Sequence, residues 1–178
     1  MVMSFGDLHP FFVHFPIAFF ILVFILELTR LFTNKIHPMV CLIVLFFGTI
    51  LAFFAMLSGQ TEYEEAMDYV NQYQVIAIPE DDNKASVGDK LKNKLQAHER
   101  SGNIVMWSSI VIFFIWLFLY LKSKDSKNYK YLKIILISVL IVFVMRSAIS
   151  GGELVRGHGL GTPQPTLNEP LNYPLEKQ

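Results

Sequence analysis

Hydrophobic residues in this chain are gathered into four long runs instead of being spread along it. The runs cover about residues 11–32, 39–57, 104–121 and 132–149. Each approaches or exceeds the roughly 18–20 residues that a helix needs to cross the hydrocarbon core of a bilayer. Each is also apolar around its whole circumference, which a soluble helix with a wet face is not. The pattern predicts an all-α membrane protein with four transmembrane helices in an up-down-up-down bundle.

Composition agrees with this interpretation. Of 178 residues, 53% are hydrophobic and 17% are charged, against the roughly 25% charged residues of soluble domains. The lipid bilayer is therefore the expected surrounding. The formal net charge is zero, so nothing in the charge balance indicates a nucleic-acid partner.

The polar connection between the second and third runs, about residues 58–103, is long and acidic. Residues 61–73 are good helix formers with an acid-rich first turn, so they either prolong the second helix or begin a new one. We expect an extramembrane helical hairpin here. Residues 1–161 then form the membrane domain. Residues 162–178, with four prolines, are expected to be an extended tail.

Basic residues flank the two short connections. Arg30 and Lys35 border the first, and five lysines crowd the second. By the positive-inside rule these connections are cytoplasmic, which places both termini and the acidic hairpin on the outer side of a bacterial inner membrane. The first run lacks a preceding Lys or Arg and a small-residue cleavage site, so it is expected to be an uncleaved anchor.

Four of the five histidines fall at the predicted outer ends of the runs: His9, His14, His98 and His158. Imidazole is the commonest nitrogen ligand of transition metals and haem iron, so this clustering indicates a cofactor site. A lone histidine at such a place is usually interfacial or solvated. The single cysteine, Cys41, excludes CxxCH haem attachment and cysteine-ligated clusters, so histidine has to hold any metal.

One proline suggests how the first two histidines are placed. Pro16 predicts a helix start near Phe15, or a kink there. His14 would then lie at the membrane boundary and His9 in the segment before the helix. As the deepest histidine, His14 is predicted to be an axial haem ligand, with His98 or His158 opposite.

Three charged positions bear on the site. Arg146, in the last turns of the fourth run, either reaches the interface or offsets a haem propionate. Arg100 either meets a propionate or pairs with Glu99. Glu27 lies three residues before Arg30, a spacing that predicts a structural ion pair.

Several motifs together resemble one known family, the domain-of-unknown-function 2231 family of predicted bacterial membrane proteins. They are HPFFVHFP at residues 9–16, the pair Ser58-Gly59, His98, and GGELVRGHGLG at residues 151–161. The resemblance implies a four-helix membrane domain that occurs alongside redox modules such as cytochromes and Rieske-type domains. It implies no established activity.

The leading functional hypothesis is a b-type haem protein that transfers electrons at the outer membrane face, as a carrier or respiratory subunit more than as a stand-alone enzyme. Bis-histidine ligation suits an electron carrier because it fills both axial positions of the iron. One alternative is a copper or zinc site held by His9, His14, His98 and His158. Another is a non-catalytic subunit that anchors a larger respiratory or secretion complex through the acidic hairpin and the Pro-rich tail. The expected protein partners are other respiratory or redox membrane proteins.

Overall fold

The computed structural model of the chain describes residues 8–33, 35–76, 82–122 and 127–158; side chains at 69, 72–76, 82–88, 127–128 and 157–158 are not described. The described residues form four helices, α1 (His9–Phe32), α2 (Pro38–Ile76), α3 (Asp82–Lys122) and α4 (Lys127–His158), with no strand in those ranges. All four are long and apolar enough to cross a membrane. The prediction of an all-α membrane protein with four spans is confirmed.

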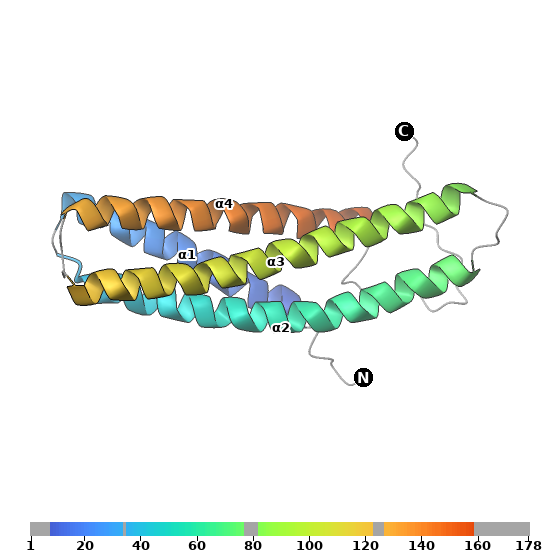
Figure 1. Cartoon of the computed structure of the whole chain (residues 1–178), viewed down its shortest axis with the longest axis horizontal. Helices are drawn as coiled ribbons and strands as arrows, with labels where there is room; N and C mark the ends of the chain where they lie inside the picture. Colours follow the sequence, from blue (N-terminus) through green and yellow to red (C-terminus); the bar gives the residue numbers. More distant parts are fainter. Residues whose placement is uncertain (1–7, 34, 77–81, 123–126, 159–178) are drawn as a thin grey trace.

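The four helices lie side by side as one bundle (Figure 1). The last residues of α1 and α3 and the first residues of α2 and α4 lie at the same end of the bundle, which we call the short-loop end. Within the described residues, α1 and α3 each pack against α2 and α4 but not against each other. The helices α1 and α3 are therefore diagonal partners across the bundle.

The helices α2 and α3 continue together beyond the end of α1 (Figure 1). Residues 61–73 thus prolong the second helix, which passes through Ser58-Gly59 without a break. The predicted hairpin packs around a small second core that it shares with α4. Leu95 of α3 and Leu154 of α4 are buried there, packed against Tyr63 and Met67 of α2.

The predicted helix start near Phe15 is wrong, and so is the predicted place of His9 before the helix. The alternative, a kink at Pro16, stays a prediction. The helix α1 begins at His9, and Pro16 lies inside it. Pro10 stands in the first turn, where backbone N–H groups need no helical partner, so it starts the helix. Pro16 has no backbone N–H, so the helix lacks one backbone hydrogen bond at this position. The long apolar helix nevertheless continues through it. The predicted tail at 162–178 lies outside the described residues.

The bundle interior and its surface are both apolar. Phe20, Leu45, Trp116 and Leu140 are fully buried, and Gly48 lets α2 approach Phe20 so closely that an added Cβ would lie 2.8 Å from Cε1 of the ring. Large apolar side chains also point outward from the helices, including Phe32, Trp107, Phe118 and Val142. An apolar exterior of this extent fits lipid and not water.

Candidate functional site: a histidine pair on the bundle axis

Two of the predicted histidines meet between the diagonal helices. The ring centroids of His9, on the first turn of α1, and His98, on α3, are 6.5 Å apart, and the ring planes are inclined by 81°. Both side chains are partly buried. Because the backbones of α1 and α3 do not contact each other, the two imidazoles bridge the bundle axis. We call this pair the histidine site.

The ring of His9 packs against the helix α2. The Nδ1 atom of His9 lies 2.9 Å from the carbonyl oxygen of Ala55 and 3.2 Å from Oγ of Ser58. A Cβ added to Gly59 would lie 2.8 Å from Cε1 of the same ring. The imidazole therefore packs directly on the helix backbone, and only glycine leaves room for it.

The ring of His98 packs against the helix α4 in the same way. Its Nδ1 atom lies 3.0 Å from Oγ of Ser150, and the backbone of Ser147 also hydrogen-bonds to this side chain. A Cβ on Gly151 would lie 2.8 Å from Cε1 of His98. Each histidine thus rests on a Ser-Gly pair of the following helix.

The hydrogen bonds also assign the proton on each ring. The hydroxyl of Ser58 donates to the carbonyl of Ala55 at 3.1 Å, and that of Ser150 donates to the carbonyl of Ser147 at 2.9 Å. Since each hydroxyl proton is used on a carbonyl, each hydroxyl oxygen accepts from the imidazole. Nδ1 is then the protonated nitrogen, and in a neutral ring Nε2 keeps its lone pair for a ligand. Metal-binding histidines are oriented in this way by a second partner.

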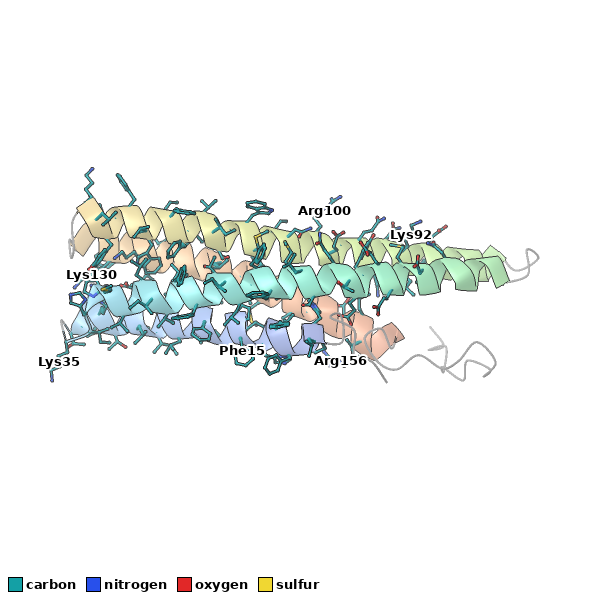
Figure 2. All side chains as sticks on the ribbon, turned by 90° about the horizontal axis from the view of Figure 1, so that it is seen from below. Phe15, Lys35, Lys92, Arg100, Lys130 and Arg156 are labelled. Carbon is teal, nitrogen blue, oxygen red and sulfur yellow. The ribbon has the colours of Figure 1, made fainter. Side chains whose placement is uncertain are left out.

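The other predicted site residues are placed differently. His14 is exposed on α1, and its Nδ1 donates to the carbonyl of Pro10 in the turn before it. His158 is the last residue of α4, and its side chain is outside the described part. Arg100 and Arg146 are exposed, and Figure 2 shows Arg100 on the outside of α3. Convergence is therefore shown for His9 and His98 alone.

His37 lies in the connection between α1 and α2, at the short-loop end. There its Nδ1 accepts a hydrogen bond from the backbone N–H of Met39 at 3.3 Å. His37 is therefore separated from the histidine site by the length of α1, as the sequence led us to expect.

Within the described ranges, no group of three or more His, Cys, Asp or Glu side chains comes together in a way that could hold a metal ion. The histidine site accordingly offers two protein ligands. Crossed planes, as seen here, are compatible with two imidazoles on one axis through a metal atom. With metal–nitrogen bonds of about 2.0–2.1 Å, opposed rings on such an axis have centroids about 6 Å apart.

The sequence interpretation did not predict which residues the two imidazole rings pack against, although the sequence contains a signal for them. Ser-Gly occurs near the end of the second hydrophobic run and again after the fourth, as Ser58-Gly59 and Ser150-Gly151. Each pair follows an apolar helix, and a small residue beside a hydroxyl is suited to a close side-chain approach. Which histidine rests on which pair depends on the helix packing.

The bundle and its histidine pair define a four-helix integral membrane protein with a partly buried imidazole site. The sequence pattern of the family described as Predicted membrane protein (DUF2231) matches residues 7–164. The chain belongs to this family, which the motifs had indicated. No curated protein and no solved structure matches the chain significantly.

Proposed function

We propose that the chain is a membrane electron carrier that binds one b-type haem, with His9 and His98 as the axial ligands. The observation that carries the proposal is the pair of partly buried imidazoles, 6.5 Å apart, each anchored through Nδ1. Iron with two axial imidazoles has no open coordination position, which suits electron transfer.

The number of ligands favours haem over a bare metal ion. A haem brings four nitrogen ligands of its own, so two histidines complete its coordination. Zinc needs four ligands in a structural site and three in a catalytic one. The described residues supply two imidazoles and no third ligand beside them. The copper or zinc alternative would require ligands from elsewhere.

The polar surroundings support the same assignment. Haem propionates need cationic partners or water. Arg100 is two residues from His98 on α3, and Arg146 precedes the Ser-Gly seat on α4. Both side chains are exposed and remain the proposed propionate partners.

The positive-inside rule places the short-loop end in the cytoplasm. On that orientation the histidine site lies toward the outer face of a bacterial inner membrane, and both termini are outside. Other redox membrane proteins are the proposed electron donors and acceptors.

A reduced-minus-oxidised absorption spectrum of the full-length protein, purified from haem-replete cells, tests the function. We expect a b-type difference spectrum in the wild type, its loss in His9→Ala and in His98→Ala, and no change in His37→Ala. A colourless wild-type protein that contains stoichiometric copper or zinc would favour the metal site. A colourless, metal-free protein would favour an anchoring role.

A further inference from the structure

The two halves of the histidine site match each other residue by residue. In each half one helix carries the imidazole, and the ring packs on a Ser-Gly pair of the next helix. The pair is Ser58-Gly59 for His9 and Ser150-Gly151 for His98. Each serine hydroxyl also donates to the carbonyl three residues before it. An approximate twofold axis along the bundle therefore relates α1 and α2 to α3 and α4 around the site.

The twofold relation breaks down at one pair of equivalent positions. Three residues after the histidine of α1 is Phe12, and four residues before the serine of α2 is Phe54. Their rings stack, with centroids 5.9 Å apart and planes inclined by 24°. The equivalent residues are Ser101 on α3 and Arg146 on α4. One half thus has an aromatic corner where the other half has a hydroxyl and a guanidinium.

Both corners lie beside the imidazoles, on the side of the short-loop end. The helices α1 and α3 run toward that end, and α2 and α4 start from it (Figure 1). With a rise of about 1.5 Å per residue, Arg146 is about 6 Å along α4 from Ser150. The Arg146 side chain is exposed and has no ion pair with the residues that the structure describes.

A second pair of equivalent positions has the same imbalance. Two residues after its histidine, α1 has Phe11 and α3 has Arg100, and both side chains are exposed. The two arginines therefore belong to the half formed by α3 and α4, and the other half has phenylalanine at both places. A molecule held between the imidazoles meets positive charge on one side and phenyl rings on the other.

We propose that this asymmetry orients the cofactor and selects a porphyrin with free carboxylates, whose carboxylate edge faces Arg146 and whose apolar edge faces the Phe12–Phe54 stack. The inference rests on the proposed function, because it takes the two imidazoles as axial ligands. A guanidinium forms strong charge-assisted hydrogen bonds with a carboxylate. A carboxylate against two phenyl rings would lose its hydration without compensation. Only one of the two orientations that a symmetric site would accept satisfies both corners.

The experiment compares haem b with its dimethyl ester, in which both carboxylates are blocked and uncharged. Each is titrated into the full-length, haem-free protein in detergent, and binding is followed by absorption. Arg146→Gln removes the guanidinium charge, and Arg146→Lys keeps a positive charge. Arg156→Gln is the matched control, because Arg156 is another exposed arginine of α4, which lies beyond the serine and donates from Nε to the carbonyl of Gly152 at 3.4 Å.

We expect the wild type to bind haem b about tenfold more tightly than the dimethyl ester, as one hydrogen bond to a charged group implies. The preference should disappear in Arg146→Gln and persist in Arg146→Lys and Arg156→Gln. The double variant Phe54→Arg/Arg146→Gln should regain it, because the twofold relation lets the carboxylate edge face the other corner.

Three results would contradict the inference. Equal affinities for the two porphyrins in the wild type, or a preference that survives in Arg146→Gln, would overturn it and leave bis-histidine haem binding intact. A double variant that keeps its helical circular dichroism but binds both porphyrins equally would show that the corners are not equivalent. Wild-type protein that binds neither porphyrin would instead overturn the proposed function itself.

Discussion

The ring planes of His9 and His98 are inclined by 81° across the bundle axis, with centroids 6.5 Å apart, although the backbones of the helices that carry them do not contact each other within the described residues. Each ring packs against the Ser-Gly pair of a neighbouring helix and hydrogen-bonds to its serine. The pair is Ser58-Gly59 for His9 and Ser150-Gly151 for His98. The site is thus built from two equivalent halves, α1 with α2 and α3 with α4.

Gly59→Ala should displace His9 and disrupt the histidine site. The new Cβ would lie 2.8 Å from Cε1 of the ring, closer than packed carbon atoms can approach. Overpacking of this kind costs about 1–3 kcal/mol, partly offset by the better helix propensity of alanine. We expect a lower unfolding midpoint together with loss of bound cofactor, measured by thermal denaturation and by absorption. Gly151→Ala should act in the same way on His98.

Gly102→Ala is the matched control, because Gly102 is also inside a long helix and has no heavy atom within 4 Å of an added Cβ. Its helix should be unchanged or stabilised by up to about 1 kcal/mol. If Gly59→Ala and Gly102→Ala have the same unfolding midpoint and the same cofactor content, the close packing of His9 on Gly59 is not required for the site.

Ser58→Ala should leave the His9 ring in the histidine site but hold its orientation less firmly. The hydroxyl is one of two partners of Nδ1, and the carbonyl of Ala55 remains at 2.9 Å. Loss of a supporting partner weakens metal affinity by about 10–100-fold in known sites. We therefore expect weaker retention of the cofactor, with the protein still folded, in competition assays with a haem-binding acceptor. Full retention in Ser58→Ala and Ser150→Ala would show that the serines do not orient the rings.

His14→Ala separates the sequence-based assignment from the structural one. The sequence predicted His14 as an axial ligand, and that remains a prediction. The structure brings His9 against His98 and leaves His14 exposed. We expect His14→Ala to keep the reduced-minus-oxidised spectrum that His9→Ala loses. Loss of the spectrum in His14→Ala, with His9→Ala unaffected, would restore His14 as the ligand.

Arg30→Met should destabilise the bundle by about 3–5 kcal/mol, since it leaves the carboxylate of Glu27 buried without its charged partner. Thermal unfolding in detergent measures the loss. The double variant Glu27→Leu/Arg30→Met should be more stable than Arg30→Met alone, because it removes both buried charges. A double variant less stable than the single one would mean that Glu27 has another partner that it stabilises.

Cysteine scanning tests the orientation. Single cysteines in place of Lys127 and of Asn83, in a Cys41→Ala background, would be exposed to an impermeant thiol reagent on intact cells. The excess of Lys and Arg beside the short connections predicts labelling at position 83 and protection at position 127. The opposite labelling pattern would put the histidine site toward the cytoplasm.

The hydrophobic pattern alone determined the class of the protein. Four uniformly apolar runs have few stable arrangements other than four membrane helices, because the lipid core leaves the backbone no outside hydrogen-bond partner. The Glu27–Arg30 ion pair was also predicted and lies at 2.7 Å, since a spacing of three residues puts both side chains on one helix face. Family membership, too, was readable from local motifs.

The tertiary structure decided which histidines meet. His9 and His14 are five positions apart on α1, so they face different sides of the helix, and only the packing of α1 against α2 turns His9 inward. Local sequence also misplaced the start of α1, because one missing hydrogen bond at Pro16 counts less than the packing of a long apolar helix. The contact between Lys133 and Trp116 likewise joins two different helices. Such contacts depend on how the helices are rotated about their axes, and in uniformly apolar helices no polar stripe in the sequence specifies that rotation.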